Sequence, residues 1–173
     1  MQKSIWIFGI IAGSFGATLE YLFFKNTSFS ANTMYLSKTL ILAICIVFGL
    51  VLIKKLIGGT ISIARTLLSG MLIAFVRSAV MIGSFLVLYY PAGDFYDAKL
   101  QESFIQAEKK ITADEDILPA DKETELEITK QQIASQYKPL GYSGLLIAES
   151  LIIGFIISIL AAAFISKNMM YTE

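Results

Sequence analysis

The sequence predicts an all-α integral membrane protein, a bundle of four transmembrane helices with an acidic helical hairpin between the third and the fourth. Hydrophobic residues fill 55% of the 173 positions and charged residues only 16%, whereas about a quarter of a globular domain is charged. The mean hydropathy is +0.67. The aliphatic residues also come in four runs, each close to the ~20 residues that a helix needs to cross the hydrocarbon core.

The first two predicted spans lie in the first third of the chain. Residues 4–24 form an apolar run that only Glu20 interrupts. A cleaved signal peptide would also begin after a basic residue, but its apolar stretch usually ends after roughly 7–15 residues, so we expect an uncleaved span. Residues 37–55 form the second span. This run is short, and it reaches both interfaces if the flanking Lys38, Lys54 and Lys55 extend their side chains to the surface.

The third and fourth predicted spans flank the hairpin. Residues 61–90 carry Arg65 near their start and Arg77 in their interior. At about 1.5 Å per residue this helix exceeds the hydrocarbon thickness, so it is expected to tilt or to project. Residues 142–165 form the fourth span, which contains Glu149.

Basic residues that flank the spans predict the orientation. Five of them fall on one side of a four-span topology: Lys3, Lys54, Lys55, Arg65 and Lys167. The positive-inside rule makes that side cytoplasmic, with both termini cytoplasmic and with Lys54, Lys55 and Arg65 as interfacial anchors in contact with lipid. Lys25 and Lys38 fall on the other side and oppose this assignment.

Residues 91–141 would then lie on the extracytoplasmic side. They hold eleven acidic residues and six lysines, a net charge of −5. A segment this long rarely lacks structure of its own. Apolar residues recur at helical spacing in two stretches: Leu100, Phe104 and Ile111, then Leu126, Ile133 and Tyr137. The capping pattern of Thr112 and Glu115, with Pro119 in the following turn, predicts the start of the second helix, and Pro139 predicts its end. This hairpin either offers a binding surface to a partner or is a charged cap that only faces water.

Three charged residues fall inside the predicted spans: Glu20, Arg77 and Glu149. A charge at the bilayer centre costs about 2.5–3.5 kcal/mol on insertion scales, so each needs a reason to be there. Counting about 1.5 Å per residue places all three at a similar depth in the outer leaflet. We predict an ion pair of Arg77 with Glu20, and Glu149 as a second acceptor or as an unpaired, protonated acid. Such a cluster either fixes helix register, or lines a polar cavity for a substrate, proton or lipid headgroup, or reaches to the nearer interface.

Small residues predict where the helices pack, because they let backbones approach closely in lipid. The predicted packing residues are Gly9, Gly13, Gly16, Gly70, Gly154 and Ser158. The first three share a helix face with Glu20, and Gly70 shares a face with Arg77. In the fourth span the small stripe is turned about 140° away from Glu149, counting about 100° per residue, so that carboxylate is expected to face another neighbour or Arg77 at an edge.

These features resemble the DUF4199 family, small bacterial membrane proteins common in Bacteroidota. The resemblance is carried by the segments Gly9 to Gly13 and Gly58 to Arg65, by small residues in the later spans, and by the acidic insertion. The small residues are Gly70, Gly154, Ser158 and Ala161. The resemblance implies a four-helix protein of the bacterial inner membrane, and it implies no catalytic residue.

The composition excludes several function classes. The chain has no histidine, which removes imidazole bases, Ser-His triads and histidine-ligated metal sites. Its one cysteine, Cys45, lies in an apolar run and is expected to be a buried hydrophobe. The zero net charge and the lack of a basic tract exclude nucleic-acid binding. No cofactor and no metal site are predicted.

Two functions remain, with a third ranked last. We expect a non-catalytic subunit or accessory partner of an envelope membrane complex, in contact with lipid and with another membrane or envelope protein or a second copy of the chain. The alternative is a small oligomeric transporter or ion-coupled channel that uses Glu20, Arg77 and Glu149. An enzyme acting on lipid would need a constellation such as a cation held by Asp94 and Asp97, whose spacing matches no known ligand loop.

Overall fold

A computed structural model describes residues 2–25, 31–59, 61–89 and 93–165. Within these ranges the regular structure is entirely helical, which confirms the all-α prediction. The elements are α1 (Gln2–Lys25), α2 (Ala31–Leu56), α3 (Ile63–Ser84), the π-helix η1 (Phe85–Tyr89), α4 (Gly93–Ala113), α5 (Lys122–Tyr137) and α6 (Pro139–Ile165). The helices are long where the sequence is aliphatic, and they end at glycine, proline or polar turns.

Four helical stretches are long and apolar enough to cross a membrane. They cover residues 2–22, 33–56, 63–87 and 139–165, and each overlaps one of the predicted spans over most of its length. The boundaries differ from the prediction by a few residues, and two of the differences concern named side chains. The second stretch starts before Lys38, so this lysine lies inside the helix and not at its flank. The fourth starts at Pro139, because proline is well suited to the first position of a helix, where the missing N–H has no acceptor anyway.

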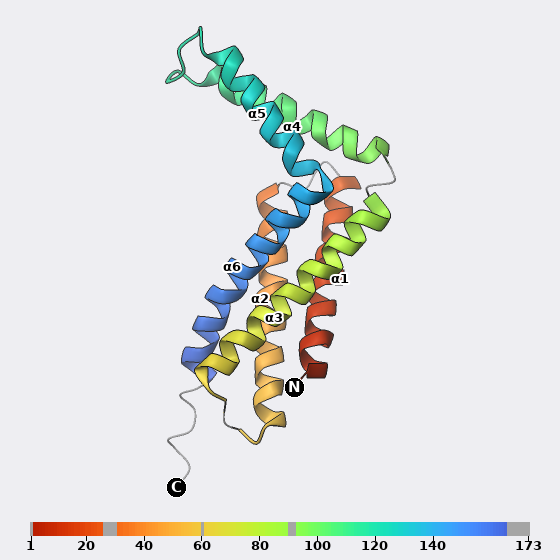
Figure 1. Cartoon of the computed structure of the whole chain (residues 1–173), viewed down its shortest axis with the longest axis vertical. Helices are drawn as coiled ribbons and strands as arrows, with labels where there is room; N and C mark the ends of the chain where they lie inside the picture. The colour runs from red at the N-terminus through yellow and green to blue at the C-terminus, as the bar shows by residue number, and fades with distance from the viewer. Residues whose placement is uncertain (1, 26–30, 60, 90–92, 166–173) are drawn as a thin grey trace. The chain divides into compact units, whose positions relative to one another are not determined.

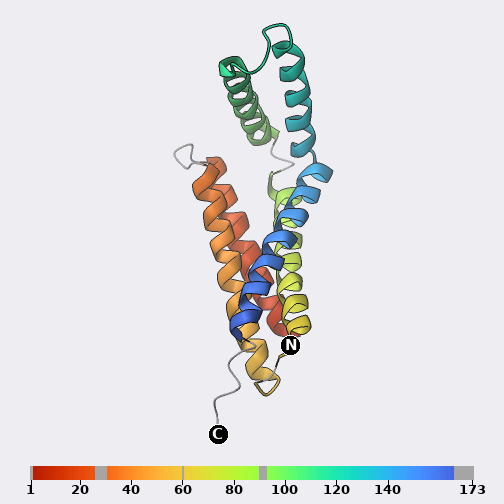
Figure 2. The ribbon, with the colours of Figure 1, turned by 90° about the vertical axis from the view of Figure 1, so that its left-hand side faces the viewer.

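The chain divides into two compact units, the first made of residues 1–84 and 146–173 and the second of residues 85–145. In the first unit, α1 and α3 run in one direction and α2 and α6 in the other (Figures 1 and 2). We call the end that holds Gln2, Leu56, Ile63 and Ile165 the basal end, and the opposite end the apical end. The four predicted spans therefore lie side by side in an up-and-down arrangement.

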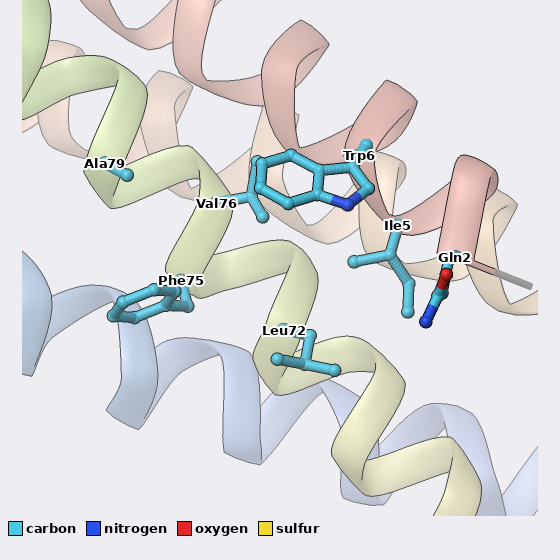
Figure 3. Close-up of a pocket in the computed structure, with 7 residues that line it drawn as sticks. All are labelled: Gln2, Ile5, Trp6, Leu72, Phe75, Val76 and Ala79. Atoms are coloured by element: carbon cyan, nitrogen blue, oxygen red, sulfur yellow. The ribbon is translucent and has the colours of Figure 1, made fainter.

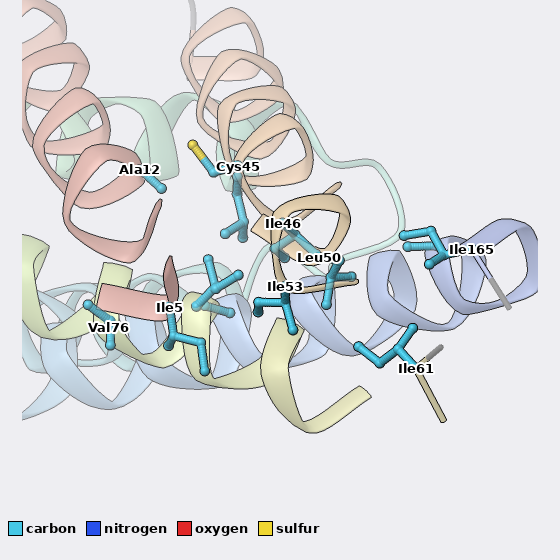
Figure 4. Close-up of a cluster of buried hydrophobic side chains, with 13 residues drawn as sticks. Ile5, Ala12, Cys45, Ile46, Leu50, Ile53, Ile61, Val76 and Ile165 are labelled. Atoms are coloured by element: carbon cyan, nitrogen blue, oxygen red, sulfur yellow. The ribbon is translucent and has the colours of Figure 1, made fainter. Parts of the chain in front are cut away.

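An apolar cluster fills the first unit toward its basal end (Figure 4). It contains fully buried side chains of α2, such as Leu50 and Ile53, with Ile5 of α1 and Ile165 of α6. Cys45 belongs to the same cluster and is a free thiol. The basal half of the bundle is thus packed mainly through apolar side chains and a few small hydroxyls, and the buried charges lie further toward the apical end.

The second unit contains the predicted helical hairpin, in which α4 and α5 pack antiparallel (Figure 2). The hydroxyls of Ser103 and Tyr137 lie 2.9 Å apart and join the two helices, and Ile111 is buried. The predicted capping role of Thr112 is wrong: α4 continues through Ala113, and the Thr112 carbonyl accepts a hydrogen bond from Lys122 Nζ (2.8 Å). Thr112 lies in the last turn of α4 because the apolar stripe of this helix extends to Ile111, and the chain needs further residues to turn back.

Candidate functional site

Glu20 and Lys38 form a buried ion pair between α1 and α2. Lys38 Nζ lies 3.3 Å from Glu20 Oε1, and the side chains of Lys38 and Glu20 are 6% and 7% exposed. Each residue lies 18 positions from the basal end of its helix, which corresponds to about 27 Å. Both charges are removed from water and from lipid, so each needs compensation inside the bundle, and the ion pair contributes to it.

Arg77 is the largest fully buried side chain of the described residues, with 1% exposure. Its Nη1 donates a hydrogen bond of 2.5 Å to Ser150 Oγ, which joins α3 to α6. Arg77 and Ser150 lie about 21 and 22 Å from the basal end, close to the depth of the ion pair. The predicted pairing of Arg77 with Glu20 stays a prediction.

Small residues bring α3 and α6 together at the level of this hydrogen bond and below it. A Cβ on Gly70 would collide with the Ser158 hydroxyl, and a Cβ on Gly154 would lie 2.5 Å from Ala74 Cβ. The Ser158 hydroxyl donates instead to the Gly154 carbonyl (2.6 Å) within its own helix. The helices therefore meet through backbone and short side chains, in the manner of small-residue contacts in membranes.

Glycines also bring α1 against α3. A Cβ on Gly9 would lie 2.5 Å from Val76 Cβ, and a Cβ on Gly13 would lie 2.6 Å from Val80 Cβ and 3.0 Å from the Arg77 carbonyl oxygen. Gly16 meets the Met81 sulfur in the same way, one turn further. The three glycines of the predicted stripe thus receive ridges of α3, so α3 is held closely on two faces.

Glu149 differs from the other predicted charges. Its side chain is half-buried, and its Oε1 is enclosed yet accepts no hydrogen bond from any residue that the structure describes. Its neighbour Ser150 faces α3, so Glu149 points about 100° away from that contact. The structure therefore does not place Glu149 on the small-residue face of α6.

The predicted basic anchors lie at the basal end. Lys54 Nζ donates 2.7 Å to the carbonyl oxygen of Ile165, the last residue of α6, where a cation also offsets the helix dipole. Lys55 and Arg65 are exposed, and Lys167 lies outside the described residues. Lys54 thus binds α6, and the other two cations are free to meet the surroundings.

The sequence does not indicate the roles of two residues in this arrangement. Lys38 precedes the aliphatic run and so fits a flank of the span, whereas the helix begins at Ala31 and includes it. Ser150 carries no charge, and its only signal is that it lies four residues before Gly154 and so continues the stripe of Gly154 and Ser158.

Nothing described in the chain resembles a metal centre. No three His, Cys, Asp or Glu side chains of the described residues gather as a metal site would require. Asp97 is exposed, and the side chain of Asp94 lies outside the described part.

Breaking the Glu20–Lys38 pair is expected to destabilise the bundle. Lys38→Gln and Glu20→Gln should each lower the free energy of unfolding, by up to about 3–5 kcal/mol, because each breaks the buried ion pair. The double variant should lose less than the sum, with a coupling of at least ~1 kcal/mol in denaturant titrations in detergent.

The same cycle with Glu20→Gln and Arg77→Gln tests the predicted second pair. A coupling well above ~0.5 kcal/mol would establish it, and additive losses would exclude it. Additive losses in the Lys38 cycle would contradict the role given to that ion pair.

A family model described as "Protein of unknown function (DUF4199)" matches residues 7–167. No curated protein and no solved structure matches the chain. The match covers all four candidate spans and the hairpin between the last two.

Proposed function

This chain belongs to the DUF4199 family, whose description names no activity, and from its own residues we propose that it is a non-catalytic subunit or accessory partner of an envelope membrane complex. In this proposal it spans the bacterial inner membrane with both termini in the cytoplasm. Its partner is another membrane or envelope protein or a second copy of the chain.

The helical hairpin carries this proposal, because α5 buries none of its 16 residues. Isolated helices of this length are marginal in water, and most helices owe their stability to an apolar face packed on something. Among the side chains that the structure describes in the hairpin, three large apolar ones are exposed: Ile105, Leu118 and Ile128. A protein that covers α5 and these side chains would supply the missing packing.

The buried charges support the same proposal. Glu20 is bonded to Lys38 and Arg77 to Ser150, between different helices, which is how polar groups hold membrane bundles together. Groups committed to helix contacts are poorly placed to carry a substrate. They account for the assembly of the bundle and leave the hairpin as the surface for a partner.

The basal cations support the orientation. Lys3, Lys55 and Arg65 are exposed at the basal end, while Lys38, which opposed the assignment, is buried in an ion pair. With Lys38 removed from the count of loop charges, the positive-inside rule favours a cytoplasmic basal end more clearly.

Glu149 favours the second candidate function, a small oligomeric transporter or ion-coupled channel. An enclosed carboxylate oxygen without a hydrogen-bond donor is a feature of intramembrane proton or ion sites. The other members of such a path would be Glu20 and Arg77.

Tagged chain extracted in nanodiscs from native membranes is expected to bring down one protein in a fixed ratio. Co-purification of this partner should be abolished by a triple variant that removes the exposed apolar contacts: Ile105→Ser, Leu118→Ser and Ile128→Ser. Gln101→Ser, Gln131→Ser and Gln132→Ser combined are the matched control, with the same number of changes at polar positions of α4 and α5, and should retain the partner. The subunit proposal would be replaced by the transport function if two results came together. The chain would purify alone as a monomer, and in liposomes it would carry a proton or ion flux that Glu149→Gln lowers.

A further inference from the structure

A groove of about 310 Å³ lies between the basal end of α1 and the middle part of α3 (Figure 3). Ile5 and Val76, each 6% exposed, form its floor. Its rim consists of Trp6, Leu72 and Phe75, which are 60%, 40% and 49% exposed. The floor is held in place because Val76 is also the residue that packs against Gly9.

The groove has apolar walls and one polar end. Gln2 lines it at the start of α1, and Ala79 lines it on α3 toward the apical end. From Leu72 to Ala79 the helix rises about 10 Å, a large part of the ~15 Å that one leaflet of hydrocarbon occupies. The groove is therefore long enough to hold a large part of an acyl chain, and it lies between two helices that are candidate spans.

Each of the two helices that form the groove carries an exposed cation toward its basal end. Lys3 follows Gln2 directly, and Arg65 lies two turns before Leu72 on the same face of α3. That face is exposed along its whole length: Arg65, Leu68, Leu72, Phe75 and Ala79. The chain holds no acidic residue between Glu20 and Asp94, so no nearby carboxylate of these helices neutralises the two cations.

We propose that the groove between α1 and α3 is a binding site for an anionic phospholipid, with an acyl chain along Trp6 and Phe75 and the phosphate between Lys3 and Arg65. A basic pair beside an interhelical groove is the arrangement that recognises anionic headgroups. The apolar walls favour a ligand with an acyl chain over a free anion, and the cations favour an anionic lipid over a zwitterionic one. This inference requires only that the helices span a membrane, and it is independent of any protein partner at the hairpin.

Trp6 is the chain's only tryptophan, and it lines the groove, so its fluorescence reports on this site alone. The purified chain in neutral detergent is titrated with phosphatidylglycerol that carries brominated acyl chains, and separately with equally brominated phosphatidylcholine. Bromine quenches tryptophan on contact. The anionic lipid is expected to quench saturably at about tenfold lower concentration than the zwitterionic lipid.

Lys3→Gln with Arg65→Gln should remove this preference. Lys55→Gln, which removes an exposed cation at the same end but on α2, should keep it. Ala79→Leu should weaken quenching by both lipids because it fills the groove. Glycerol phosphate without chains should not displace the brominated lipid.

Several outcomes would overturn the proposal. Equal quenching by the two lipids in the unaltered chain would mean ordinary lipid contact, and displacement by glycerol phosphate would mean a site for the free anion. Protection of Trp6 from both lipids, with disulfide crosslinking of Leu72→Cys chains in a Cys45→Ala background, would mean that a second copy covers the groove.

Discussion

Arg77→Ala is expected to lower the free energy of unfolding by about 3–5 kcal/mol. The substitution removes the largest fully buried side chain of the described residues and leaves a cavity between α3 and α6. It also deprives the Ser150 hydroxyl of its donor. Denaturant titration in a neutral detergent measures the change.

Arg65→Ala is the matched control, because it makes the same chemical change in the same helix at an exposed position. We expect a change within about 0.5 kcal/mol, as for most surface substitutions. Equal losses for the two variants would mean that the burial of Arg77 contributes nothing, and would also contradict the role given to its bond with Ser150.

Gly13→Val is expected to cost about 2–3 kcal/mol by overpacking the contact of α1 with α3. A Cβ at this position meets Val80 Cβ at 2.6 Å and the Arg77 carbonyl oxygen at 3.0 Å. Because one of these atoms belongs to the backbone, a side-chain rotation cannot relieve both contacts, and the helices must separate. The loss appears in the same titration and as a lower thermal unfolding midpoint.

Gly83→Val controls for the change of helix propensity. Gly83 lies near the end of α3, where an added Cβ meets nothing within 4 Å. The free energy of unfolding of the Gly83→Val variant should therefore stay within about 0.5 kcal/mol of that of the unaltered chain. A loss at Gly83 as large as the loss at Gly13 would refute close packing as the reason for the glycine in α1.

The fold could be predicted because lipid imposes a simple rule: a span must be helical, apolar and about 20 residues long. That rule identifies α1, α2, α3 and α6 from hydropathy alone. It fails at span ends, where a long basic side chain fits either inside or outside the helix. Lys38 was misplaced for this reason, since its burial depends on Glu20, which is 18 positions away in sequence and on another helix.

The charged cluster could be predicted only in part. The cost of charges in lipid singles out Glu20 and Arg77, and both are buried in the structure. Their contacts depend on the rotation of each helix about its axis, which the spacing of residues in one helix does not determine. Thus Arg77 donates its hydrogen bond to Ser150, an uncharged residue that the cost of charges in lipid does not single out. The turn between α4 and α5 escaped prediction because a capping pattern is only a local preference, which the apolar stripe of α4 overrides.

The bond between Arg77 and Ser150 also sets an order of events during biogenesis. The two residues are 73 positions apart, and synthesis at about 5–20 residues per second separates them by roughly 4–15 s. For that interval α1, α2 and α3 have emerged while the face of α3 that carries Gly70 and Ala74 still lacks α6. A chain that stops before residue 150 therefore lacks the α6 acceptor of Arg77 and keeps a bare small-residue face of α3 in the lipid, which distinguishes an unfinished product from a finished one in the membrane itself.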